Sequence, residues 1–174
     1  MLLVEREAVL GGRWRYDTTA MTLEPDNQIV PRCRVASDLA SQVEASGNCR
    51  ILKDSVAFAW YDEDILAVSS PGVFWELEPK RTIVATGSYE TPMVFENNDL
   101  PGIFTVEALQ RMMHRDCVRP GKQAVVAAYG DEGYAIARQL VDAGVAVAGI
   151  LASRAREEAL PAVESHGLAA NGIP

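Results

Sequence analysis

Two apolar runs in the second half of the chain enclose a stretch of helical periodicity, and this arrangement leaves few folds open. Residues 123–128 and 145–152 have the composition of buried strands. Between them, the spacing of apolar residues predicts a helix over 131–143 that stops at Gly144. Strands that alternate with helices in this way form parallel sheets. The sequence therefore predicts a βαβ unit and an α/β fold.

The turn that opens this predicted helix, AYGDEG, partly matches the G-x-G-x-x-G loop that binds dinucleotides. Gly130 and Gly133 occupy the second and third positions, where glycine lets the backbone approach a pyrophosphate and lets helix and strand pack closely. Ala128 occupies the first position, where it is tolerated only if its φ is negative. Gly130 and Gly133 are therefore candidate cofactor-binding residues.

The AYGDEG loop departs from the dinucleotide-binding motif in three ways. Besides Ala128, the carboxylates of Asp131 and Glu132 stand where a phosphate would bind, so they can cap the helix themselves and repel an anion. Ala152 occupies the place of the ribose-binding acid, whereas Arg154 could bind the 2′-phosphate of NADP. Two interpretations remain: a degenerate βαβ unit, which the departures favour, and a working NAD(P) site.

The rest of the chain predicts two further helices, a set of strands and a final helix. Residues 13–34 are polar and irregular, and the last predicted helix, 153–167, is interrupted at Pro161. Acidic residues and Pro71-Gly72 separate three consecutive strand-like runs, which predicts an antiparallel meander. The predicted strands are 1–5, 50–61, 65–70, 73–78 and 81–87, and the helices are 37–46, capped by Ser37, and 105–116, capped by Thr105.

Two segments of the first half have the pattern of a flavoprotein. A buried strand ends in Glu5, whose carboxylate could bind ribose hydroxyls, and Gly11-Gly12 follow, where the chain could pass close to a cofactor. Later, the apolar run 81–87 ends in Ala85-Thr86-Gly87, as does the late strand of a flavoprotein with two dinucleotide-binding domains. Either segment alone fits an ordinary turn, but the two occur in the expected order.

Composition limits the other possibilities. The 174 residues carry 24 acids against 16 lysines and arginines, a net charge of −8, which argues against nucleic acid as a partner. No apolar run is long enough to span a membrane, and the first residues do not form a signal peptide. The three cysteines are odd in number and lack C-x-x-C spacing, so we expect no disulfide framework, no metal site and a cytoplasmic location: Cys33, Cys49 and Cys117. The two histidines, His114 and His166, are isolated in the sequence and are not expected to be catalytic.

Residues 55–68, 85–104 and 119–137 carry a resemblance to a known family, and FENNDLPG (95–102) is its most specific part. From Met1 to about Arg154 the chain resembles the α subunit of heterotetrameric sarcosine oxidase and its relatives, which include subunits of opine oxidase, cyanide-forming glycine dehydrogenase and dye-linked proline dehydrogenase. The resemblance implies two partial Rossmann-like FAD/NAD(P)-binding domains with a three-stranded antiparallel meander. NAD or FAD would bind in the first domain, and amine oxidation would use flavin in a partner subunit.

The resemblance also implies the roles of individual residues. It places the domains at 1–95 and 123–174, joined by a crossover at 96–122, and the family's first strand and phosphate loop should precede Met1. We therefore expect a middle segment of a longer subunit that is purified without flavin. No residue qualifies as a catalytic acid, base or nucleophile. The cofactor-binding candidates are Glu5 for the ribose hydroxyls, Gly11, Gly12 and Arg13 along the cofactor channel, Val56 for adenine through its backbone, and Ala85, Thr86 and Gly87 to close the site.

Two other functions fit the same sequence. One is a fragment of an NAD(P)H-dependent flavoprotein reductase, in which the loop of Gly130 and Gly133 works and Arg154 binds NADPH. The other is a non-catalytic scaffold that carries no cofactor and docks partners through aromatic residues, although such residues more often pack in a core or meander: Trp14, Trp60, Phe74 and Trp75. Because a sheet that lacks its first strand would expose an edge and an apolar face, we expect other subunits of a hetero-oligomer, or a homo-oligomer, as partners.

Overall fold

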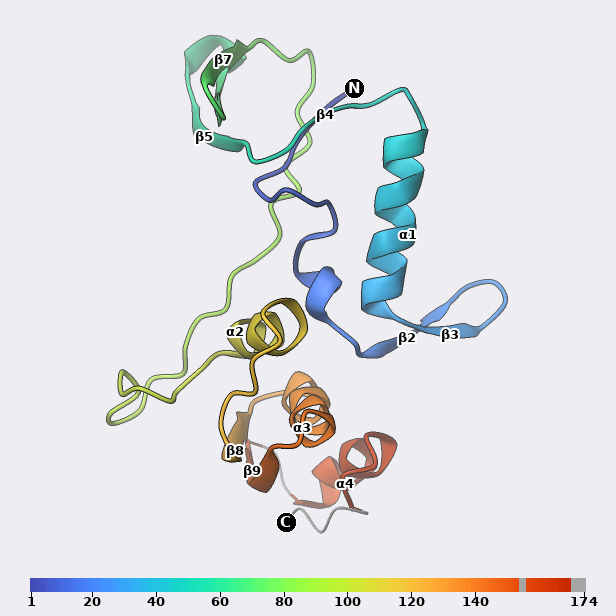
Figure 1. Cartoon of the computed structure of the whole chain (residues 1–174), viewed down its shortest axis with the longest axis vertical. Coiled ribbons are helices and arrows are strands. Elements are labelled where there is room, and N and C mark those ends of the chain that lie inside the picture. The colour runs from blue at the N-terminus through green and yellow to red at the C-terminus, as the bar shows by residue number, and fades with distance from the viewer. Residues whose placement is uncertain (154–155, 170–174) are drawn as a thin grey trace. The chain divides into compact units, whose positions relative to one another are not determined.

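The computed structural model describes residues 1–153 and 156–169 (Figure 1). The chain mixes helices with parallel and antiparallel strands, which confirms the predicted α/β class. It divides into two compact units, Met1–Ser88 and Tyr89–Pro174. No helix in the described part of the chain is long and apolar enough to cross a membrane.

The first unit begins with a parallel pair of short strands. β1 (Leu2–Val4) pairs with β4 (Arg50–Leu52). The strand predicted over 50–61 is in fact two strands in different sheets, because the chain turns at Asp54, whose φ of 50° is left-handed. The parallel pair thus ends where the meander begins.

The segment between β1 and β4 is more ordered than its irregular sequence predicts. It contains a short 3-10 helix, η1 (Gly12–Tyr16), and an antiparallel hairpin of β2 (Ala20–Leu23) and β3 (Gln28–Pro31). Each strand has only four residues, and Pro25 in the turn and Pro31 at the end of β3 obscure the apolar pattern, so the sequence predicts no strands here.

Helix α1 (Arg32–Ala45) begins five residues before the predicted cap, Ser37. Its N-cap, Pro31, supplies no side-chain hydrogen bond. Instead, the first amides of the helix bond to backbone carbonyls brought by the fold: Arg32 N–H donates to Thr19 O at 3.0 Å, and Cys33 N–H to Asp17 O at 2.9 Å. Because these partners are distant in sequence, local capping signals could not locate this start.

The antiparallel meander is confirmed. β5 (Val56–Trp60), β6 (Leu66–Ser70) and β7 (Val73–Leu77) form a three-stranded sheet in that order, with the one-turn 3-10 helix η2 (Asp62–Asp64) between the first two strands. The register pairs Val56 with Ser69 and Ser69 with Phe74.

The strand predicted over 81–87 is wrong. These residues have no regular structure, and the apolar side chains that should be buried are exposed, Ile83 by 86% and Val84 by 67%. An apolar run becomes a strand only when a neighbouring strand pairs with its backbone. No strand of the described residues pairs with this segment.

The second unit contains the predicted βαβ unit. β8 (Gln123–Ala128) and β9 (Ala146–Ala152) pair in parallel, and α3 (Glu132–Asp142) joins them. Helix α2 (Val106–Gln110) continues as a π-helical turn, η3 (Arg111–Arg115), and α2 packs on α3. Helix α4 (Arg156–Ser165) runs through Pro161, so the predicted interruption is wrong.

The core of this unit lies between α3 and one face of the two-stranded sheet. Side chains of α3 that recur at helical spacing point inward and meet alternate side chains of β8 and β9. The buried residues are Val126, Tyr134, Ile136, Ala137, Leu140, Val145, Val147 and Leu168.

Candidate functional site

The carboxyl ends of β1 and β4 bring together two of the predicted cofactor-binding residues. Glu5 directly follows β1, and its N–H donates to Leu52 O at 2.8 Å. Its own carbonyl accepts a hydrogen bond from Ser55 N at 2.9 Å, and Val56 is the next residue. In open parallel sheets, ligands bind at this edge. The fold therefore places Glu5 and the backbone of Val56 side by side.

The carboxylate of Glu5 is held in one orientation. Glu7 N–H donates to its Oε1 at 2.9 Å, and the side chain is half-buried. No hydrogen bond to its Oε2 occurs among the described residues. A fixed carboxylate with one available oxygen can accept hydrogen bonds from two neighbouring hydroxyls, as a ribose would present them.

Gly11 is required by packing. Its φ is +115°, and a Cβ there would lie 2.9 Å from Cγ of Arg15 and 3.2 Å from Cβ of Ala36 on α1. At Gly12, by contrast, an added Cβ would meet no atom within 4 Å, and Arg13 follows in η1. The first glycine thus seats the loop on α1, and the second leaves its backbone open to a ligand.

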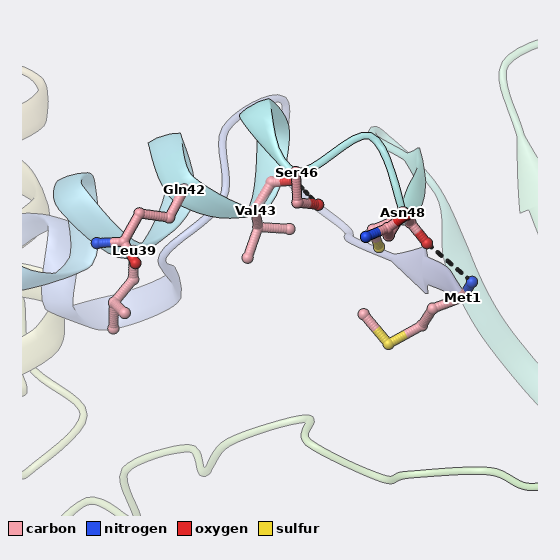
Figure 2. Close-up of a pocket in the computed structure, with 7 residues that line it drawn as sticks. Met1, Leu39, Gln42, Val43, Ser46 and Asn48 are labelled. Carbon is pink, nitrogen blue, oxygen red and sulfur yellow. Dashed lines mark hydrogen bonds between the residues drawn. The ribbon is translucent and has the colours of Figure 1, made fainter.

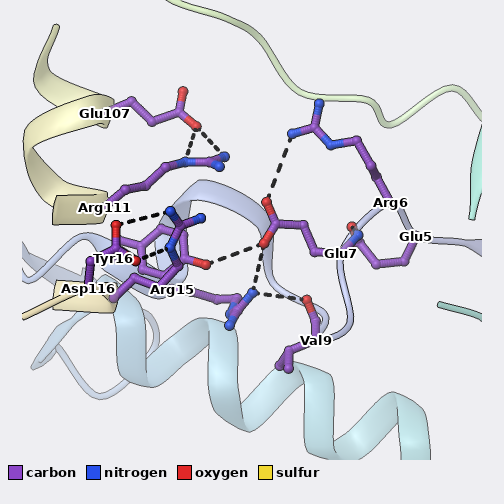
Figure 3. A network of polar contacts seen from close by, with 10 residues as sticks. Glu5, Arg6, Glu7, Val9, Arg15, Tyr16, Glu107, Arg111 and Asp116 are labelled. Atoms are coloured by element: carbon purple, nitrogen blue, oxygen red, sulfur yellow. Dashed lines mark hydrogen bonds and ion pairs between the residues drawn. The ribbon is translucent and has the colours of Figure 1, made fainter. Parts of the chain in front are cut away.

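A polar network around Glu7 fixes the loop between β1 and η1 (Figure 3). Glu7 Oε2 receives hydrogen bonds from Arg15 Nη1 at 3.3 Å and from the Tyr16 hydroxyl at 3.4 Å. The same Arg15 nitrogen donates to Val9 O at 3.3 Å. Arg15 therefore ties η1 to the loop through both the Glu7 carboxylate and the Val9 carbonyl.

Asp17 anchors the far end of η1 to the start of α1. It is 3% exposed, accepts from Thr19 N at 2.9 Å and pairs with Arg32 Nη1 at 2.9 Å. Burial raises the pKa of this carboxyl, but the hydrogen bonds from Thr19 and the Arg32 guanidinium outweigh that effect and hold the pKa below its ordinary value. The Arg32 guanidinium also lies 5.7 Å from the ring centre of Trp14.

The structure does not bring the late segment to this site. Ala85, Thr86 and Gly87 are exposed and irregular, and none of them forms a hydrogen bond with Glu5 or Val56. Their predicted location at a strand end is therefore wrong in this conformation. Their role in cofactor binding stays a prediction.

The loop of the βαβ unit keeps the packing role of the motif. A Cβ on Gly133 would overlap the side chain of Ala128 and lie 3.0 Å from its Cα, so helix and strand touch here as in a dinucleotide fold. The φ of Ala128 is not positive, and this is the condition under which alanine can replace the first glycine of the motif. Gly130 faces open space.

The start of α3 differs from the predicted cap. Asp131 occupies the N-cap position with helical backbone angles and makes no side-chain capping hydrogen bond, so the cap predicted for Asp131 is wrong, whereas Glu132 lies in the first turn as predicted. The end of β9 is tied to the loop, since Ser153 donates through N to Ala128 O at 3.1 Å and through Oγ to Tyr129 O at 3.2 Å. Arg154 lies outside the described residues.

A hollow that no sequence pattern predicted lies between α1 and the start of the chain (Figure 2). Its volume is about 430 Å³. Leu39 and Val43, one helical turn apart, form one wall, and the N-terminal ammonium of Met1 donates to Asn48 O at 3.0 Å beside it. The only signal was the apolar spacing on α1. The remaining lining residues are Gln42, Ser46 and Cys49.

His114 has a structural partner. Its Nε2 lies 3.1 Å from Oε1 of the buried Gln139, which also faces Gln110 Nε2 at 3.4 Å. This contact links η3 to α3. Within the described residues, no group of three His, Cys, Asp or Glu side chains could hold a metal ion.

These features define a mixed α/β protein that combines a parallel strand pair, a three-stranded meander and a βαβ unit. A solved structure with this arrangement is L-proline dehydrogenase from P. horikoshii, with a TM-score of 0.70 and 25% identity over 84% of this chain and 29% of that chain. No family model matches the chain.

Proteins of similar sequence include subunits of sarcosine oxidase and of opine oxidase. The alpha chain of sarcosine oxidase from Rhizobium meliloti (strain 1021) is 28% identical over 168 residues, and the match spans 88% of this chain and 16% of that protein. Its counterpart in Corynebacterium sp. (strain P-1) is 39% identical over 74 residues, 42% of this chain and 8% of that protein. An opine oxidase component from Agrobacterium tumefaciens (strain Ach5) is 33% identical over 82 residues, 47% of this chain and 16% of that protein. The chain is thus homologous to a segment of the sarcosine oxidase α-subunit family.

Proposed function

We propose that this chain binds the adenosine part of FAD or NAD at the carboxyl ends of β1 and β4, as a segment of an amine or amino-acid oxidoreductase of the sarcosine oxidase type. One observation carries the proposal: the backbone hydrogen bond from Ser55 N to Glu5 O, which holds the residue that follows β1, Glu5, beside the first residue of the meander, Val56. The similarity to sarcosine oxidase subunits supports the same assignment.

The residues take the following roles in this proposal. Glu5 accepts hydrogen bonds from the ribose hydroxyls through its available oxygen, and Val56 meets adenine through its backbone. Gly12 and Arg13 lie along the path of the cofactor, where Gly11 holds the loop on α1. A role for Ala85, Thr86 and Gly87 requires segment 81–87 to adopt a strand conformation.

The chain itself supplies binding rather than chemistry. The oxidation of an amine or amino acid would take place in other subunits of a hetero-oligomer, and flavin would accept the electrons there. The proposal leaves the βαβ unit of β8, α3 and β9 as a structural unit, because carboxylates occupy the anion position and Ser153 ties the strand end to the loop. NADP binding through Gly130, Gly133 and Arg154 is the second candidate, and the loop variant described in the Discussion tests it.

Calorimetry with ADP-ribose tests the proposal, because this ligand contains the adenosine diphosphate that FAD and NAD share. We expect the full chain to bind it and Glu5→Gln to weaken binding by about tenfold, since hydrogen bonds to charged groups contribute roughly 1.5–3 kcal/mol. Glu24→Gln, an exposed change in the β2–β3 turn, is the matched control and should leave binding unchanged. Equal affinity of Glu5→Gln and the unmodified chain would overturn the proposal, as would an absence of binding.

A further inference from the structure

The meander carries an exposed aromatic face. A β-bulge leaves Phe58 without a partner on β6, between the pairs Ala57–Val68 and Ala59–Ala67. Bulges redirect side chains, and here the Phe58 ring reaches 5.8 Å, centroid to centroid, from Phe74 on β7. Phe58 is 53% exposed and Phe74 57% exposed.

Val56 completes this face, which we call the meander patch: Val56, Phe58 and Phe74. The register sets Val56 and Phe74 on either side of Ser69, so they share one face of the sheet, and the ring contact with Phe74 places Phe58 on the same face. On the opposite face, the Arg50 guanidinium lies 5.1 Å from the ring centre of Trp75. The Trp75 ring is therefore partly covered, whereas the two rings of the meander patch stay open to solvent.

Uncompensated negative charge lies at one end of the same sheet. Residues 54–79 contain six acids and no lysine, arginine or histidine, so they carry −6 of the chain's net charge of −8. Four of these acids gather where β5 ends, β6 begins and β7 ends, because Leu66 pairs with Leu77. They are Asp62, Asp64, Glu76 and Glu78, all exposed.

These four carboxylates have no cationic partner within the described part of the chain. No ion pair or hydrogen bond there joins any of them to a lysine, arginine or histidine. The next cations along the chain, Lys80 and Arg81, form no ion pair with them either. Glu76 lies two residues from Phe74, and therefore on the same face as the meander patch.

We infer that the meander patch and its acidic end form a docking surface for a basic protein partner, one that presents arginines around apolar side chains. Arginine fits both halves of the surface, because its guanidinium pairs with carboxylates and stacks on aromatic rings. Exposed apolar patches with a polar rim mark protein interfaces, and complementary charge fixes the partner and its orientation. This inference goes beyond the proposed function and needs no cofactor.

The test uses the full chain and a short fluorescent peptide of alternating arginine and leucine, followed by anisotropy. We expect binding that weakens as salt is raised, and no binding of the corresponding glutamate–leucine peptide. Phe58→Ser with Phe74→Ser, and separately Asp62→Asn with Asp64→Asn, should each weaken binding by about tenfold, the loss that a central interface residue causes.

The matched control is Glu24→Gln with Asp26→Asn, which removes the same charge from the β2–β3 turn of the same unit. It should change affinity by less than about twofold, because exposed charges beyond a Debye length are screened. An equal loss in this control would show a general charge effect and overturn the inference, as would undetectable binding of the arginine–leucine peptide. If the phenylalanine variant does not fold, as circular dichroism would reveal, the aspartate variant alone decides the question. The peptide experiment contains no nucleotide, so its failure is separate from a failure of ADP-ribose binding.

Discussion

Gly133 at the start of α3 lies against Ala128 at the end of β8 so closely that no side chain fits between them. A Cβ on Gly133 would lie 3.0 Å from the Ala128 Cα and would overlap its Cβ. This contact sets how closely α3 approaches the sheet of β8 and β9, and therefore how the core of the second unit packs.

We predict that Gly133→Ala destabilises the protein by roughly 1–3 kcal/mol, the usual cost of overpacking. Neither the strand backbone nor the Ala128 methyl group can move aside without disturbing the core. Gly130→Ala is the control, because its added methyl group would enter open space and its φ is not positive. Urea denaturation of both variants measures the effect, and equal stabilities would contradict the prediction.

The βαβ loop yields a second prediction. Asp131→Ser with Glu132→Ala should lower the free energy of unfolding by roughly 0.3–1 kcal/mol, because it removes favourable charge from the first turn of α3. The backbone of Asp131 is already helical, so serine there gains no cap. Calorimetry should show that the double variant binds NAD and NADP no more tightly than the unmodified chain, because the Glu5 site is the same in both proteins. A gain of affinity in the double variant would mean that charge is the only obstacle at the βαβ loop. Tight NADP binding by the unmodified chain that Glu5→Gln leaves unchanged would favour a working NAD(P) site there.

A third prediction concerns the stability of the protein at low pH. The pKa of Asp17 is lower in the folded protein than in the unfolded chain, because hydrogen bonds from Thr19 and the Arg32 guanidinium outweigh its burial. The carboxylate therefore contributes stability above its unfolded pKa of about 3.9, and this stability is lost as pH falls below that value and through the folded pKa. Asp17→Asn should lower the Tm at neutral pH, and its difference from the unmodified chain should shrink below about pH 4.

The control for Asp17 is Asp38→Asn, which breaks the exposed pair of Arg34 and Asp38 on α1. Such pairs contribute about 0–1 kcal/mol, so the Tm of this variant should follow the unmodified chain at each pH. A gap between Asp17→Asn and the unmodified chain that stays constant down to low pH would refute the role given to its charge.

Tyr134 provides a fourth prediction. Its side chain is buried in the core of the second unit, and its hydroxyl has no hydrogen-bond partner among the described residues. A buried hydroxyl without a partner costs roughly 1–3 kcal/mol in protein mutational data. Tyr134→Phe keeps the ring and removes that cost, so it should raise the Tm, whereas the exposed Tyr61→Phe should not. A lower Tm for Tyr134→Phe would point to a partner for the hydroxyl, such as a buried water.

The sequence alone determined the elements whose signals are local. The spacing of apolar residues around Gly133 located β8, α3 and β9, and the acidic and Pro-Gly turns located the meander, because period and turn chemistry act within a few residues. The end of the first strand nominated Glu5 and the family resemblance nominated Val56, and the backbone bond between Ser55 and Glu5 sets these two residues side by side.

The tertiary structure decided what depends on distant partners. Helix α1 starts at Arg32 because the carbonyls of Thr19 and Asp17 receive its first amides. The run 81–87 has the composition of a strand, yet it is irregular where no described strand pairs with it. A strand or a helix start needs its backbone hydrogen bonds satisfied, and residues far away in the sequence supply those bonds. The ring contact between Phe58 and Phe74 likewise depends on the folded sheet. These residues lie on different strands, and the bulge in β5 turns the Phe58 ring toward Phe74.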